Sequence, residues 1–168
     1  MSQTNNIQIL EAVAADMSDV RALFVEYQQW LNVDLCFQGF EEELVTLPGR
    51  YASPKGVIYL AVADGEPIGC VAVRPRTSDE AELKRLYVRS PNRGRGAGKR
   101  LFDAAMTRVR QMGYSSIVLD TLPSMRIAKS LYTAYGFRNI PPYYHNPEEG
   151  AEYYRCDLAK PGKAGTKA

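Results

Sequence analysis

A glycine-rich turn between a β-rich run and an amphipathic segment constrains this sequence more than any other feature. Residues 82–88 read as a strand, residues 93–98 spell Arg-Gly-Arg-Gly-Ala-Gly, and apolar residues at helical spacing follow. A strand, a turn and a helix in this order bring backbone N–H groups together at the positive end of a helix dipole. The segment therefore predicts an anion site, and its glycines would let a pyrophosphate approach the backbone closely.

Two well-known phosphate loops do not match this spelling. The nucleoside-triphosphate loop requires glycine where Arg93 stands, and Ser or Thr where Arg100 stands. The dinucleotide fingerprint could begin at Gly94 and Gly96, but it requires a small residue where Lys99 stands. Both readings are disfavoured.

The remaining pattern predicts one α/β domain over residues 5–158, with a solvated, flexible tail at 159–168. Asp64-Gly65 predicts a tight hairpin turn. Crossovers around Leu101 and Leu131 favour parallel neighbouring strands, and Ser124 is a candidate helix cap. The expected strands are 7–11, 57–63, 68–73, 82–88, 116–122, 137–140 and 153–158, and the expected helices are 16–31, 39–47, 98–112 and 125–135. We predict a mixed, mostly antiparallel sheet of six to seven strands with helices on both faces.

Composition narrows the function classes. The net charge of +2 gives no general electrostatic reason to expect a nucleic-acid partner, and the arginines near the glycine turn are too local to change this. Three cysteines without a C-x-x-C pair predict neither disulfides nor a metal site. No segment resembles a signal peptide or a membrane span. We expect a cytoplasmic protein without a membrane partner, either a monomer or a homodimer.

Two motifs carry a family resemblance. Arg93-x-x-Gly96-x-Gly98 resembles the acetyl-CoA loop of the GNAT N-acetyltransferases, written Gln/Arg-x-x-Gly-x-Gly/Ala. Leu131-Tyr132-x-x-x-Gly136-Phe137 resembles the end of the next helix in that family. The order of elements is similar over roughly residues 7–158. The resemblance implies the GNAT fold, acetyl-CoA as co-substrate, and acetyl transfer to a primary amine, which could belong to a small molecule, an amino acid or a protein.

The resemblance also implies roles for individual residues. Glu82 would be the base, and Tyr132 would be the partner of the CoA sulfur. An alkyl ammonium with a pKa of about 10.4 must lose a proton before it can attack a thioester. The cofactor-binding set would be Leu86, Tyr87, Val88, Arg93, Gly94, Arg95, Gly96, Ala97, Gly98 and Lys99. Met125 stands where the family often has Asn, so the contacts of that amide are in doubt.

No sequence motif identifies the residues that would bind the acceptor amine. Tyr143, Tyr144 and His145 precede the last strand, and the family's corresponding loop lies over the acceptor, so they are candidate substrate contacts. Tyr27 and Trp30 on the first helix are further candidates. We expect direct transfer through a ternary complex. The alternative is a non-catalytic acyl-CoA binding or sensing module.

Overall fold

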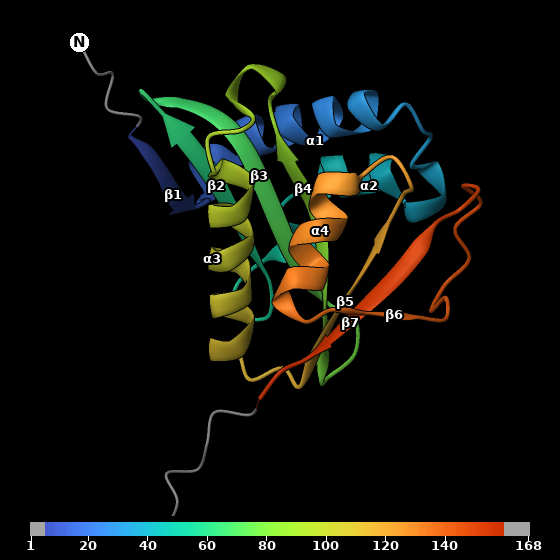
Figure 1. Cartoon of the computed structure of the whole chain (residues 1–168). Helices are drawn as coiled ribbons and strands as arrows, with labels where there is room; N and C mark the ends of the chain where they lie inside the picture. Colours follow the sequence, from blue (N-terminus) through green and yellow to red (C-terminus); the bar gives the residue numbers. More distant parts are fainter. Residues whose placement is uncertain (1–5, 160–168) are drawn as a thin grey trace, which may run out of the picture.

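The computed structural model describes residues 6–159, which form one open sheet with helices on both faces (Figure 1). The predicted tail lies outside the described residues except for Ala159. Within residues 6–159 the sheet has seven strands in the order β1-β2-β3-β4-β5-β7-β6. The strands are β1 Ile7–Glu11, β2 Val57–Ala63, β3 Glu66–Pro75, β4 Glu80–Val88, β5 Ser116–Thr121, β6 Arg138–Ile140 and β7 Glu152–Asp157. Only β4 and β5 pair in parallel, so the prediction of a mixed, mostly antiparallel sheet is confirmed.

Two apolar clusters cover the two faces of the sheet. Helices α3 Ala97–Gln111 and α4 Arg126–Tyr135 pack on one face, where Phe102 and Ile117 are fully buried. Helices α1 Met17–Leu31 and α2 Phe40–Thr46 pack on the other, around Phe24. Short 3₁₀ turns flank these helices at Ala14–Asp16, Cys36–Gln38, Gly49–Tyr51 and Ser90–Asn92. No helix within residues 6–159 has the length and apolar character needed to cross a membrane.

Local turn chemistry explains most element boundaries. Asp64 and Gly65 both have positive φ, 51° and 79°, as the predicted tight hairpin turn requires. Gly136 ends α4 in the left-handed conformation at φ 110°. The expected Ser124 cap is wrong. The Met125 N–H bonds the Leu122 carbonyl in a turn, so the helix begins one residue later and Met125 occupies the cap position without a side-chain hydrogen bond.

The crossover through α4 differs from the prediction. We expected the strands on either side of Leu131 to be parallel neighbours, but β7 lies between β5 and β6. β7 pairs with β5 over six residues, whereas β6 offers only three residues to its own partner. The longer strand forms the more extensive ladder at this position, and the short β6 becomes the edge strand.

The parallel pair β4–β5 is short and then splits. Residues Glu80–Glu82 pair with Ser116–Val118, and no further β4 residue pairs with β5. On its other side β4 carries a bulge, because two residues, Arg85 and Leu86, face a single residue of β3. Arg85 has φ 62°, a left-handed conformation that turns the strand. Figure 1 shows β4 and β5 diverging toward their C-terminal ends.

The α3 face should depend strongly on Phe102, which is fully buried against Tyr132, Tyr135 and Phe137. We predict that Phe102→Ala lowers the free energy of unfolding by about 3–5 kcal/mol, because it removes the ring and leaves a cavity. Urea denaturation provides the measurement. Val45, 81% exposed on α2, is the control, and Val45→Ala should change stability by less than about 0.5 kcal/mol. Equal effects of the two substitutions would contradict this description of the core.

Candidate active site

A groove crosses the amino end of α3, where the sequence predicted an anion site. It encloses about 910 Å³ of space not filled by atoms, and part of it is open to solvent. Every residue of the expected cofactor-binding set except Arg95 lines it. The lining residues are Leu86, Tyr87, Val88, Asn92, Arg93, Gly94, Gly96, Ala97, Gly98, Lys99, Ile127, Ala128 and Leu131. Ile127, 88% exposed, gives the groove an apolar wall on the α4 side.

The start of α3 has the features of an anion site. Gly96 begins the helix at φ 84°, and no side chain in the described part of the chain caps it. The first N–H groups of the helix therefore remain available at its positive end. The Nε atom of Arg95 is buried without a hydrogen-bond partner among residues 6–159, but Arg95 does not line the groove. The uncapped amides at the positive end of the helix fit a site that an anion completes.

Arg93 fixes the loop to the rest of the protein. Its Nε donates to the Val88 carbonyl at 2.9 Å, and its guanidinium lies 4.5 Å from the ring centre of Trp30. Trp30 also packs against Tyr87. The structure thus places Trp30 beside Arg93, in the glycine-rich turn that we call the cofactor loop (residues 93–98). Trp30 does not line the opening between β4 and β5.

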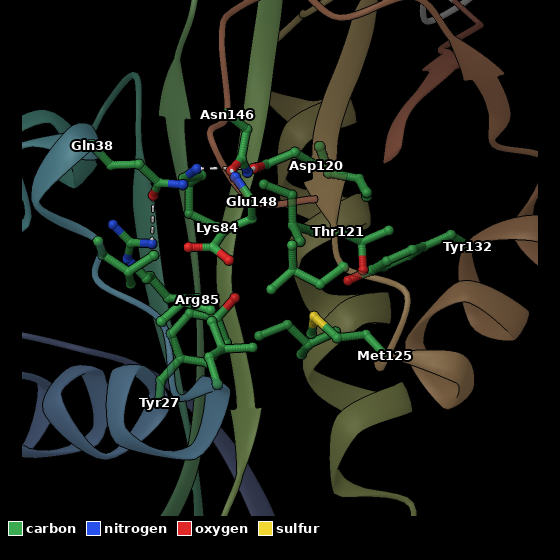
Figure 2. A pocket seen from close by; sticks show the side chains of 17 residues that line it. Tyr27, Gln38, Lys84, Arg85, Asp120, Thr121, Met125, Tyr132, Asn146 and Glu148 are labelled. Atoms are coloured by element: carbon green, nitrogen blue, oxygen red, sulfur yellow. Dashed lines mark hydrogen bonds and ion pairs between the residues drawn. The ribbon is translucent and has the colours of Figure 1, made fainter. Parts of the chain in front are cut away.

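That opening is a cavity in the middle of the sheet, which we call the splay cavity (Figure 2). The space not filled by atoms is about 540 Å³ when open solvent is included, but only about 30 Å³ of it is wide enough for water-sized molecules. Residues Leu83–Leu86 line it from β4, and Leu119–Leu122 line it from the end of β5. The other lining residues are Tyr27, Leu31, Val33, Leu35, Gln38, Met125, Tyr132, Asn146 and Glu148.

Tyr132 lies at one side of the splay cavity, held by Phe102 and Phe137. Burial raises the pKa of its hydroxyl well above the usual value, so the group remains a protonated donor. Figure 2 shows the side chains of Thr121 and Tyr132 directed toward one another. The Thr121 hydroxyl is buried and has no hydrogen-bond partner among the described residues. Two hydroxyls therefore stand at the same side of the cavity, next to the sulfur of Met125.

The opposite side of the splay cavity is charged. The buried Lys84 ammonium donates to Asp120 at 3.2 Å, and Asp120 also accepts hydrogen bonds from Tyr144 and Asn146. Burial alone would raise the pKa of Asp120, but the Lys84 charge and these hydrogen bonds outweigh it and lower the pKa. Burial lowers the pKa of Lys84 despite the nearby carboxylates. Tyr27, on α1, also lines the splay cavity.

Glu82 lies in an adjoining cavity, which we call the acceptor cavity. It encloses about 650 Å³ and is lined by Gln38, Arg50, Arg74, Arg76, Glu82, Lys84, Tyr143 and Tyr144. Glu82 accepts hydrogen bonds from Arg74 at 2.8 Å and from Tyr143 at 2.7 Å, with Lys84 at 3.9 Å. Burial alone would raise the pKa of Glu82. The charges of Lys84 and Arg74 and the two hydrogen bonds lower it by more, so the net shift is downward.

The five residues predicted to contact the acceptor are placed differently from one another. Tyr143 and Tyr144 line the acceptor cavity, and Tyr27 lines the splay cavity. Trp30 packs on the cofactor loop. His145 is exposed, and it is the next residue, Asn146, that lines the splay cavity. Their roles toward substrate remain predictions.

Sequence reasoning missed the polar residues that the fold brings to the opening. Lys84 and Asp120 are 36 positions apart, and only the parallel pairing of β4 with β5 joins them. One signal was present, because Asp120 follows the apolar run Ile-Val-Leu at 117–119, where a charge is costly unless it has a partner. Arg74 and Thr121 gave no such signal.

The Lys84–Asp120 pair generates a stability prediction. Asp120→Asn leaves the buried Lys84 with only Glu82 at 3.9 Å, so the free energy of unfolding should fall by about 3–5 kcal/mol. The double variant Lys84→Met/Asp120→Leu removes both charges and should regain most of this loss in urea denaturation. Because the folded-state pKa of Asp120 lies below its usual 3.8, the stabilisation is present above that pH and is lost as the pH falls through the folded value. The double variant should therefore lose less stability at acid pH than the parent. A double variant as unstable as Asp120→Asn would refute the pairing.

Comparisons with known proteins agree with this geometry. The model of the acetyltransferase (GNAT) family matches residues 20–137. An uncharacterized N-acetyltransferase from Schizosaccharomyces pombe is 37% identical, and the match covers 95% of this chain and 100% of that protein. A GNAT-family acetyltransferase from Staphylococcus aureus has the same fold, with a TM-score of 0.75, 20% identity and coverage of 91% and 99% of the two chains. The PaiA N-acetyltransferase from Thermoplasma acidophilum, solved in complex with coenzyme A, has a TM-score of 0.70 at 17% identity, with coverage of 91% and 99%.

The family match spans more than half of the chain, and the fission-yeast relative is similar over nearly its whole length. The protein is therefore an acyltransferase, and the chain belongs to the GNAT family of acetyltransferases.

Proposed function

We propose that this protein moves an acetyl group from acetyl-CoA directly to a primary amine while both substrates are bound. One observation carries the proposal, namely that the three hollows adjoin one another through shared lining residues. Leu86 lines both the groove and the splay cavity, and Gln38 and Lys84 line both the splay cavity and the acceptor cavity. A cofactor bound from the α3 side and an amine bound from the α2 side would meet between β4 and β5.

The groove has the chemistry to hold a nucleotide thioester. The N–H groups from Gly94 to Gly98, together with Lys99, would bind the pyrophosphate. The β4 residues Leu86 and Val88 have no β5 partner, so their backbone groups, apart from the Val88 carbonyl that already accepts from Arg93, can bind an extended amide chain as another strand would. Acetyl-CoA supplies the acetyl group as a thioester. The structural relative from Thermoplasma acidophilum was solved with coenzyme A.

Glu82 is the proposed base, acting on the amine directly or through water. Its lowered pKa keeps it ionised at neutral pH, which is the form able to accept a proton. The same lowered pKa makes it a weak base toward an ammonium group. Glu82 therefore serves by attracting and orienting the ammonium and by accepting its proton, directly or through water, before the freed nitrogen lone pair attacks the thioester carbonyl.

Tyr132 is the proposed donor to the leaving sulfur. A thiol has a pKa near 8.5 and a phenol near 10, so full transfer of the phenol proton is uphill even before burial is considered. Burial raises the pKa of Tyr132 further. The hydroxyl therefore acts by donating a hydrogen bond to the developing thiolate, and the nearby Thr121 hydroxyl is a second donor of the same kind.

Direct transfer also agrees with the positions of the cysteines. Cys70 is buried between sheet and helix, and burial raises the pKa of its thiol. Cys156 is buried in β7, and Cys36 is exposed before α2. None of the three lines the splay cavity, so the transfer does not require an acyl-cysteine enzyme.

Tyr132→Phe tests the donor. The substitution keeps the ring packing and removes only the hydroxyl, so kcat should fall about tenfold to a hundredfold, the equivalent of one hydrogen bond to a charged group. The KM for acetyl-CoA should change less than threefold. Tyr135→Phe on the same helix is the matched control and should leave kcat within about twofold. Equal kcat values for the Tyr132 variant and the parent would contradict the assignment.

The proposed reaction is tested by thiol release from acetyl-CoA with a panel of amines, amino acids and peptides. With an active amine, initial rates at varied concentrations of both substrates should give intersecting double-reciprocal lines, the pattern of a ternary complex. Parallel lines would indicate an acyl-enzyme and overturn direct transfer. Tight acetyl-CoA binding by calorimetry without turnover on any amine would instead support a binding module.

A further inference from the structure

Three guanidinium groups converge at the mouth of the acceptor cavity. Arg74 and Arg76 flank Pro75 at the end of β3, and Arg50 donates from its Nη2 to the Pro75 carbonyl at 2.6 Å. The three arginines therefore come together from two segments that are 25 positions apart. All three line the acceptor cavity, in which Lys84 is a fourth cation and Glu82 is the carboxylate.

The carboxylates around this cluster neutralise two of the three arginines. Arg74 pairs with Glu82 at 2.8 Å, and Arg76 pairs with Glu80 at 3.0 Å. Of the described residues, no carboxylate lies within 4.0 Å of Arg50, whose printed partner is the Pro75 carbonyl. Arg74 also lies 3.8 Å from Glu43, so within the described part of the chain Arg50 is the arginine of the three that has no ion pair. The mouth of the cavity therefore favours an anionic group from outside the chain.

Arg76 is presented in a fixed orientation. Its guanidinium lies 4.8 Å from the ring centre of Tyr143, and one nitrogen bonds Glu80, while about a third of the side chain remains exposed. A guanidinium has five N–H donors in a planar fork that matches a carboxylate. One ion pair therefore leaves donors available on Arg76, and a single carbonyl contact leaves donors available on Arg50.

The same cavity also offers a place for an ammonium group. Glu82 lies among its lining residues, and its carboxylate is ionised at neutral pH. A second ammonium on the substrate would lie near Arg50, which has no ion pair among the described residues, and this disfavours diamines and polyamines. A molecule with one amine and one or more carboxylates matches both ends of the cavity.

We propose that the acceptor is an amino acid or a short peptide in which Arg50 and Arg76 bind a carboxylate while the amine lies toward Glu82. This assignment rests on the proposed acetyl transfer. Arg50 and Arg76 are specificity-determining residues in this scheme, and they take no part in the bond changes.

A graded series of acceptors tests the assignment. Glutamate, glutamine and glutamine α-amide carry two, one and no carboxylates on the same skeleton, and KM should rise at each loss. Arg50→Gln and Arg76→Gln should each raise the KM for glutamate about tenfold or more, with little change in kcat or in the KM for acetyl-CoA. Arg50→Lys keeps the charge and should recover part of the loss.

Arg21→Gln is the matched control for Arg50. Arg21 is an exposed arginine on α1 whose Nε donates to the Leu44 carbonyl at 3.0 Å, so it makes the same kind of contact outside the cavity. Its substitution should leave the KM for glutamate unchanged. Equal KM values for the three acceptors, or a stronger preference for O-phosphoethanolamine than for any amino acid, would overturn the carboxylate assignment.

A binding measurement separates this inference from the reaction itself. Glutarate has two carboxylates and no amine, so it cannot be acetylated. Calorimetry should detect its binding to the parent protein and to Arg21→Gln, with at least tenfold weaker binding to Arg50→Gln. If glutarate binds in this pattern but no amine is acetylated, the proposed reaction fails and the anion site remains. If amines without a carboxylate are acetylated and glutarate does not bind, the proposed anion site is wrong and the proposed acetyl transfer stands.

Discussion

The candidate site depends on β4 leaving β5 immediately after Glu82. Two features of β4 make this possible, the early end of the parallel ladder and the bulge at Arg85. The left-handed conformation of Arg85 is costly for a residue with a side chain, and its surroundings hold it in place. Its guanidinium bonds Glu43 at 3.0 Å and Gln38 at 2.9 Å, and lies over the ring of Phe40. The α2 region thus stabilises the turn in the strand that opens the sheet.

The electrostatics of the opening differ between its two sides. The carboxylates Glu82 and Asp120 have lowered pKa values because cations and hydrogen bonds surround them. Tyr132, Tyr143 and Tyr144 have raised pKa values, chiefly through burial and, for the last two, nearby carboxylates. At neutral pH the two carboxylates are therefore ionised, and the three tyrosine hydroxyls are protonated. In the proposed reaction, the hydroxyls of Tyr132 and Thr121 would serve the cofactor side and the charges around Glu82 the acceptor side, so little reorganisation would be needed when charge develops.

The sequence predicted those parts of the fold that depend on local chemistry. The strand, turn and helix around Gly94–Gly98 and the helix ending at Gly136 follow from spacing and from residues that adopt positive φ. The predicted cofactor residues other than Arg95 lie in one groove for the same reason, since they are neighbours in the chain. The position of β7 beside β5 could not be predicted, because it depends on competition between strands of different length. The Lys84–Asp120 pair and the arginines around Pro75 were also missed, because each joins segments far apart in sequence.

The short ladder between β4 and β5 also affects how stiff the protein is. Strands β1–β4 and strands β5, β7 and β6 form two sub-sheets that share only three residue pairs, with helices on either side. Because so few backbone hydrogen bonds join the two sub-sheets, we expect the domain to bend more readily along this seam than within either sub-sheet. A pantetheine arm that lay in the seam would pair with the sheet as an additional strand does, and would connect the two sub-sheets. The molecule would then be most rigid when it is loaded with its thioester, and the shape of the amine site would depend on whether that arm is in place.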